Sequence, residues 1–312
     1  MKIAMLKKMF FTVLAFLMLG LVTAQIDPVS KEVLAKQKEF KSLKAAYKKP
    51  DLVYILNLKG KGLDNLPKEF MNLRRIQVID LSDNNFSFFP EVLCRLRFVQ
   101  VLHFESNKML ELPSAIEKLK YLEEVYLANN SITALPSQFN KLTLLKVLNV
   151  DNNMITSIPH EIMEIKDLQV LSMANNKLTE IPVSIGNLTK LTNLNFSGNE
   201  INQLPDEIAN LSSLQTLDLD NNKLILFPSK ISELKALRVL NLKNNQLGEI
   251  PLEIGLLSNL TTLNLSNNKL TTIPAELFNL KSLKKLDLKG NQISEQEKQK
   301  IKQNLPNTEI IF

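Results

Sequence analysis

The feature that most constrains the fold of this chain is a proline that recurs every 23 residues, ten times from Pro67 to Pro274. A fixed period of this length is typical of a solenoid, in which each unit packs only against its neighbours. The period therefore predicts the architecture and narrows the function to surface recognition, without naming a partner. An asparagine stands six residues before all but the first proline, and one more continues the series: Asn84, Asn107, Asn130, Asn153, Asn176, Asn199, Asn222, Asn245, Asn268 and Asn291.

The unit that contains Val125-Tyr126-Leu127 indicates how each repeat folds. The alternation of these three residues has the period of a strand with one buried face. The segment 136–142 begins with proline and has apolar residues three apart, so we predict a short helical or 3-10 turn. Because the turn returns the chain to begin the next strand in the same direction, the strands must form a parallel sheet. The return segments are broader than the strand spacing, so we expect the strands to line a concave side.

The asparagine series has a structural explanation. A buried turn leaves backbone donors and acceptors without strand partners, and these groups must be satisfied. An asparagine amide can both donate and accept, so it can bond the backbone of its own turn and of the next one. Repeated in register, the side chains form a ladder along the edge of the core. We therefore predict that these asparagines are structural and do not bind a ligand.

The spacing of leucines, asparagine and proline from Leu214 to Leu234 resembles the leucine-rich repeat family, in the 23-residue Leu-Pro class of bacterial and Ras-group repeat proteins. The match covers about residues 52–293, or about eleven units. The resemblance implies an α/β solenoid shaped as a right-handed horseshoe, with short parallel strands on the concave face and short helical or 3-10 turns on the convex face. It also implies that the concave face binds a protein. It does not imply a Ras partner.

The N-terminus has the features of a secretory signal. A positive stretch ends at Lys8, an apolar stretch of 14 residues follows (9–22), and small residues up to Ala24 allow cleavage before Gln25. We therefore predict a signal peptide at 1–24 and an exported protein, in the periplasm, at the cell surface or secreted. Fourteen residues are few for a bilayer span, so no membrane span is expected after cleavage. If the segment is not a signal, the protein is a cytoplasmic scaffold of the Ras-group type.

Both ends of the repeat array depart from the period, as expected where a terminal unit has a neighbour on one side only. The first unit has Lys61 where the ladder would have asparagine. Before the repeats, 25–51 is predicted as an N-terminal capping helix that starts near Asp27-Pro28. After them, 294–312 is predicted as a C-terminal cap, with a capping-box helix from Ser294 and a final edge strand.

Composition excludes several classes of function. The formal net charge is +6, and removing the three lysines of 1–24 leaves about +3, which is too weak and too evenly spread to indicate nucleic-acid binding. Cys94 is the only cysteine, so no intrachain disulfide can form. Extracellular solenoids of eukaryotes often carry disulfide caps, so the single cysteine favours a bacterial protein. We expect Cys94 to be an inert, semi-buried thiol, and the protein to be a monomer.

No arrangement of residues indicates catalysis. The chain has two histidines, His103 and His160, and no nucleophile pairs plausibly with both a base and an orienting acid. His103 and Glu105 supply only two of the three or more ligands that a metal site needs. The segment 218–222 superficially resembles a calcium loop but lacks its glycine and its final glutamate. We therefore predict a non-enzymatic protein without cofactor or metal. A carbohydrate-active protein is the less favoured alternative.

The outward strand positions are the candidate binding surface. Most of them are short and polar, as expected of a solvated sheet face. Aromatic residues beside fixed charge are typical of interface anchors, and one group of neighbouring positions has this composition. We predict that this group is the principal partner site, with two acidic residues farther along as an alternative and an exposed phenylalanine as a possible contact edge. The principal site consists of Asp80, His103, Glu105, Glu124 and Tyr126. The alternative acidic residues are Asp218 and Asp220, and the exposed phenylalanine is Phe88.

Overall fold

The structure is a computed structural model that describes residues 28–312. The predicted signal peptide, 1–24, lies outside the described residues. The described residues divide into two units, 28–37 and Lys38–Phe312. In the first, the described part contains the four-residue helix α2 (Lys31–Leu34). No helix in the described part of the chain is long and apolar enough to cross a bilayer.

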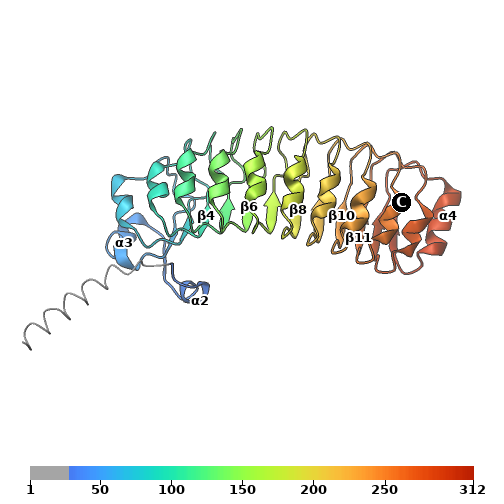
Figure 1. Cartoon of the computed structure of the whole chain (residues 1–312). Coiled ribbons are helices and arrows are strands. Elements are labelled where there is room, and N and C mark those ends of the chain that lie inside the picture. Colours follow the sequence, from blue (N-terminus) through green and yellow to red (C-terminus); the bar gives the residue numbers. More distant parts are fainter. Residues whose placement is uncertain (1–27) are drawn as a thin grey trace, which may run out of the picture. The chain divides into compact units, whose positions relative to one another are not determined.

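The second unit is built on one parallel sheet of 13 strands, which follow one another in sequence order (Figure 1). From β2 to β12, each strand residue pairs with the residue 23 positions later, as Val125 does with Leu148, so equivalent side chains form columns across the sheet. This confirms the predicted parallel solenoid. The strands are β1 (Glu39–Phe40), β2 (Ile55–Asn57), β3 (Val78–Asp80), β4 (Val101–His103), β5 (Glu124–Tyr126), β6 (Val147–Asn149), β7 (Val170–Ser172), β8 (Asn193–Asn195), β9 (Thr216–Asp218), β10 (Val239–Asn241), β11 (Thr262–Asn264), β12 (Lys285–Asp287) and β13 (Glu309–Ile311).

A 3-10 helix follows each recurring proline. In the first of these, the amide of Phe70 donates to the carbonyl of Pro67 at 3.0 Å, which is the short-range bond of a 3-10 turn. Proline suits this place because its fixed φ starts the turn and its missing N–H is not needed. The 3-10 helices are η2 (Pro50–Leu52), η3 (Lys68–Asn72), η4 (Glu91–Arg95), η5 (Ser114–Lys118), η6 (Ser137–Lys141), η7 (His160–Glu164), η8 (Val183–Asn187), η9 (Asp206–Asn210), η10 (Ser229–Glu233), η11 (Leu252–Leu256) and η12 (Ala275–Asn279).

A continuous apolar core runs between the sheet and the 3-10 helices. Within one repeat, Val125 and Leu127 of the strand segment and Phe139 of η6 are fully buried. Burying a leucine contributes on the order of 2 kcal/mol to the stability of the fold. The buried side chains of a single repeat cannot offset the conformational entropy that is lost when that repeat becomes ordered. The core is therefore stable only as a stack of repeats.

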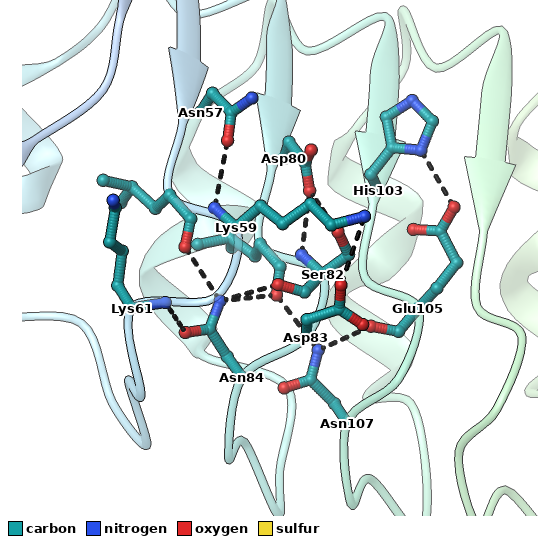
Figure 2. Close-up of polar contacts among 12 residues, drawn as sticks. Asn57, Lys59, Lys61, Asp80, Ser82, Asp83, Asn84, His103, Glu105 and Asn107 are labelled. Atoms are coloured by element: carbon teal, nitrogen blue, oxygen red, sulfur yellow. Dashed lines mark hydrogen bonds and ion pairs between the residues drawn. The ribbon is translucent and has the colours of Figure 1, made fainter.

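The ladder asparagines bond the backbone of two repeats. The Asn84 amide donates to the carbonyls of Leu81 and Ser82 in its own turn and to that of Leu58 in the preceding repeat, at 2.9 to 3.0 Å (Figure 2). Its oxygen accepts from the amide of Lys61, again in the preceding repeat. The ladder thus reaches back to the preceding turn, whereas the sequence prediction had it reach the next one. The reason is that a carbonyl 26 residues earlier lies within hydrogen-bond distance of each ladder amide, as that of Leu81 does for Asn107 at 3.0 Å.

A second asparagine column lies on the exposed side of the same turns. Its members precede the ladder residues and have positive φ, 54° at Asn152 and 51° at Asn175, because the chain turns sharply where each strand ends. Asparagine tolerates this left-handed conformation better than most residues. The Asn175 amide donates to the Asn152 oxygen at 2.9 Å, and Asn244 donates to Asn221 at 2.7 Å. This column therefore adds hydrogen bonds outside the core.

The two ends differ from the repeats. Where a single N-terminal capping helix is predicted for 25–51, the structure has α2, β1 and α3 (Leu43–Ala46). Ser42 caps α3 by accepting from the amide of Ala45, and Phe40 is buried and pairs with Leu56, so the sheet begins one strand before the repeats. In place of one continuous helix, the segment 25–51 therefore contains a short strand, β1, that pairs with the edge of β2.

At the other end, α4 (Glu295–Asn304) is capped by Ser294, whose hydroxyl accepts from the amide of Glu297 at 3.2 Å. The last strand, β13, then pairs with β12 and ends the sheet. Ile301 of α4 is fully buried. The segment 294–312 thus has the helix and the edge strand that the sequence predicts.

Candidate protein-binding site on the strand face

Outward side chains of β3, β4 and β5, with that of Glu105 just after β4, form the candidate site. We call Asp80, His103, Glu105, Glu124 and Tyr126 the acidic-aromatic patch. The register places Asp80 beside His103 and His103 beside Tyr126 on adjacent strands. The structure therefore brings together the residues that the sequence groups. Whether they contact a partner stays a prediction.

His103 and Tyr126 stack across the two strands. Their ring centroids are 4.6 Å apart and their planes differ by 2°. Directly opposed residues of paired strands have adjacent Cβ atoms, so two flat side chains at such positions can lie one on the other. The pair presents a flat aromatic surface on an otherwise polar face.

Glu105 holds the His103 ring. Its Oε1 lies 3.0 Å from His103 Nδ1, and this hydrogen bond raises the pKa of His103 although burial acts in the opposite direction (Figure 2). The other carboxylate oxygen, Glu105 Oε2, is shielded from solvent and has no hydrogen-bond partner within residues 28–312. A shielded oxygen that accepts no hydrogen bond destabilises the folded protein until a donor group reaches it.

Glu124 holds the Tyr126 ring. The phenol hydroxyl donates to Glu124 Oε2 at 3.0 Å. Burial and then this hydrogen bond raise the pKa of Tyr126 to about 12, so the phenol is neutral at physiological pH. Each ring of the stacked pair is therefore fixed by a carboxylate two residues away.

Asp80 is partly engaged by its own strand end. Its Oδ1 accepts from the amide of Ser82 at 2.9 Å and from the Ser82 hydroxyl at 2.6 Å (Figure 2). The nearby cation Lys59 pairs with Asp83 at 3.1 Å. The carboxylate of Asp80 is thus held in place by Ser82, and its main contribution to the patch is its negative charge.

Asp218 and Asp220 form a separate acidic site. They belong to β9 and the turn after it, and three strands, β6 to β8, separate them from the patch. Asp218 Oδ1 accepts from the amide of Asp220 and from the side chain of Asn241, both at 3.0 Å. Burial is the main cause that raises the pKa of Asp220. The structure therefore does not join these two residues to the acidic-aromatic patch.

Phe88 is half-exposed (49%) and lies beside a cavity of about 530 Å³. Met71 and Val92 also line this cavity, and neither is predicted as a contact residue from the sequence. The column of Val92 could have indicated it, because the equivalent position is Glu in five other repeats. Two other phenylalanines of this region, Phe86 and Phe104, are fully buried, and their ring centroids are 5.1 Å apart.

The remaining reactive side chains have structural surroundings. Cys94 is buried, and desolvation raises the pKa of its thiol to about 11. Among residues 28–312, no group of three or more histidine, cysteine, aspartate or glutamate side chains is placed to hold a metal ion.

Together, the single parallel sheet, the proline-initiated 3-10 helices and the asparagine ladder define a repeat solenoid. A sequence profile described as a leucine-rich repeat region matches residues 136–225 and 183–302, which together make up more than half of the chain. A profile of the single leucine-rich repeat matches residues 75–96. The chain belongs to the leucine-rich repeat family. Its repeats form a domain that is, in general, a protein-interaction module, and proteins of this family are usually non-enzymatic.

Solved structures of this family resemble the chain. One belongs to an octameric complex of latrophilin 3, Unc5D and FLRT2, with 26% identity, a TM-score of 0.74 and coverage of 84% of each chain. A TDR receptor has 30% identity and a TM-score of 0.71, and the match covers 82% of this chain and 46% of the receptor chain. The internalin inlF of Listeria monocytogenes has 24% identity and a TM-score of 0.68, with coverage of 94% and 85%, and supports the fold alone. This chain thus spans less than half of the TDR receptor chain. No curated protein sequence matches it significantly.

Proposed function

We propose that this protein is an exported, non-enzymatic module that binds a protein partner on its strand face, with the acidic-aromatic patch as the principal contact. The observation that carries the proposal is the stacked pair of His103 and Tyr126, each ring fixed by a carboxylate. Aromatic side chains with fixed geometry lose little entropy on binding and are typical of interface hot spots. A further support is the family, in which one similar structure is part of a complex with other proteins.

The charge of the patch indicates what kind of surface the partner presents. Three carboxylates, those of Asp80, Glu105 and Glu124, surround one imidazole. A lysine or arginine side chain of a partner could lie on the aromatic surface and donate to these carboxylates. We therefore expect the partner to contribute a basic segment, because complementary charge sets orientation and association rate.

The partner can be identified by affinity capture with the mature protein, followed by mass spectrometry. The variant with His103→Ala and Tyr126→Ala should then lose capture of that partner while its melting temperature changes little, because both side chains are partly exposed. The matched control carries Asp218→Asn and Asp220→Ser at the separate acidic site. Loss of capture in the control and not in the patch variant would overturn the proposed location.

Export rests on the signal-like segment 1–24, and sequencing of the mature N-terminus tests it. A start at Gln25 supports export to the periplasm, the cell surface or the medium. An intact N-terminus in a cytoplasmic fraction would instead favour a cytoplasmic scaffold of the Ras-group type. We also propose that the protein is a monomer, which sedimentation can test. We propose that it neither binds nucleic acid nor acts on carbohydrate, which binding and activity assays can test.

A further inference from the structure

The cavity beside Phe88 is a second candidate contact, away from the strand face. It lies where two consecutive repeats meet, between the segment 65–71, which runs into η3, and the segment 88–95, which runs into η4. Its volume is about 530 Å³. The lining combines the apolar side chains of Leu66, Met71, Phe88 and Val92 with the cations of Lys68 and Arg95.

Two of the apolar lining residues are unusual for their place in the repeat, and a third is exposed. Phe88 and Val92 occupy columns that are mostly polar in the other repeats, and Met71 is 39% exposed. The repeat does not need large apolar side chains at these positions, since most other units fold without them. Exposed apolar residues gathered around one hollow are typical of a contact site.

The charges at the rim indicate the ligand. Neither Lys68 nor Arg95 forms an ion pair with another residue in the described part of the chain, and the one acidic group of the lining is Glu91. The rim therefore has an excess of positive charge beside an apolar hollow. From this arrangement we propose that the cavity binds a partner peptide segment that carries a large apolar side chain flanked by carboxylates.

The same chain contains a natural comparison. Leu226 occupies the column of Phe88 and lines a cavity of about 520 Å³ at the equivalent place in a later repeat. That lining contains no lysine or arginine, and its one charged residue, Asp206, pairs with Lys230 at 2.9 Å. An acidic peptide should therefore prefer the cavity at Phe88 to the cavity at Leu226.

Methionine methyl groups can report on binding without a known partner. Of the five methionines in residues 28–312, only Met71 and Met154 are strongly exposed, and only Met71 lines the cavity. In the full chain labelled with 13C at the methionine methyl groups, the peptide acetyl-Asp-Phe-Asp-amide should shift the Met71 signal. The Met154 signal should stay unchanged.

Variants separate the two parts of the recognition. Phe88→Ser, which introduces the residue found in the same column at Ser157, should abolish the Met71 shift, whereas Leu226→Ser should leave it unchanged. Lys68→Gln or Arg95→Gln should weaken binding by about two- to fivefold each, as expected for an ion pair at an exposed rim. The neutral peptide acetyl-Asn-Phe-Asn-amide and the peptide acetyl-Asp-Gly-Asp-amide should both bind more weakly than the acidic phenylalanine peptide.

Other results would overturn the proposal. They include a Met71 signal that does not respond to the acidic peptide at millimolar concentration, and one that responds equally to the neutral peptide. A Met71 signal that moves with protein concentration alone would indicate a second copy of this chain as the occupant. A stronger response to laurate than to the peptide would indicate an anionic amphiphile.

Discussion

His103 lies flat on Tyr126, with the ring planes 2° apart, although the two residues are 23 positions apart in the sequence. The alignment of β4 with β5 places the rings, and Glu105 and Glu124 fix them by hydrogen bonds at 3.0 Å. Residues two apart on an extended chain lie on the same face, so each carboxylate reaches the ring of its own repeat. The pair is therefore ordered before any partner arrives.

Protonation of His103 should make stability depend on pH. The hydrogen bond with Glu105, and the charges of Glu105, Asp80 and Glu124, raise the pKa of His103 in the folded protein, while burial opposes them. A raised folded pKa stabilises the protein fully below the unfolded pKa of about 6.5, and this contribution is lost as the pH rises through the folded pKa. We expect the free energy of unfolding to fall by less than about 1 kcal/mol over this window, because the imidazole is partly exposed.

The effect can be measured by NMR titration of the His103 ring in a His160→Gln background, which leaves one histidine signal. Glu105→Gln should lower the midpoint of the titration, because the hydrogen bond with the Glu105 carboxylate is the largest cause of the raised pKa of His103. Urea unfolding at pH 5.5 and pH 8.5 should show the corresponding loss of stability, and the Glu105→Gln variant should show less of it. An unchanged midpoint in that variant would contradict the role of Glu105.

A ladder asparagine should matter more for stability than its exposed neighbour. In the middle of the array, the Asn153 amide donates to Leu127 and Val150 carbonyls, and its oxygen accepts from the amide of Ile132 at 2.9 Å. Asn153→Ala leaves these buried groups without a partner, and we expect a loss of about 2 to 4 kcal/mol in the free energy of unfolding.

The control for this change is Asn152→Gly, in the exposed column of the same turn. Asn152 has a φ of 54°, which glycine adopts without strain, and its side chain bonds only at the surface. We expect a change of less than about 0.5 kcal/mol. Urea unfolding followed by circular dichroism compares the two variants, and equal losses would argue against a special role for the buried ladder.

The repeating part of the fold could be predicted because each of its causes recurs every 23 residues. Proline marks the 3-10 helices, asparagine marks the turns, and alternation marks the strands. The N-terminal end has no such repetition. There, β1 depends on the pairing of Phe40 with Leu56 in the first repeat, which no pattern around Phe40 reveals. The prediction of a single helix for 25–51 was therefore wrong.

The candidate site was predictable in its membership and not in its geometry. The period places His103 next to Tyr126, but the stacking angle and the choice of Glu105 as the partner of His103 depend on side-chain conformation. The cavity beside Phe88 could not be predicted as a cavity, since its volume depends on how Met71 and Val92 pack across two repeats. In the sequence, Phe88 and Val92, two apolar residues in mostly polar columns, are the signals that point to this place.

Gly198 should be important for stability, whereas Gly248 should not. It has a φ of +66°, and a Cβ atom there would lie 2.1 Å from Asn175 Oδ1, so the Asn175 side chain would have to move. We expect Gly198→Ala to cost about 1 to 2 kcal/mol in the free energy of unfolding, from the left-handed backbone alone. At Gly248, a Cβ atom would have no other atom within 4 Å, so Gly248→Ala is the matched control. Urea unfolding of both variants tests this, and equal stability would show that the turn can adjust.

Cys94 should react slowly in the folded protein. Burial raises the pKa of its thiol to about 11, and the thiolate is the reactive form. At pH 8, a thiol with this pKa has a thiolate fraction roughly two orders of magnitude below that of an ordinary cysteine with a pKa near 8.5.

Because Cys94 is the only cysteine, a reaction with 5,5′-dithiobis(2-nitrobenzoic acid) reports on this site alone. We expect the native protein at pH 8 to react at least about 100-fold more slowly than the protein unfolded in urea. Glu91 opposes the thiolate and Lys118 favours it, so Lys118→Gln should slow the native reaction further. A native rate close to the unfolded rate would mean that the segment η4 opens readily and that burial does not protect the thiol.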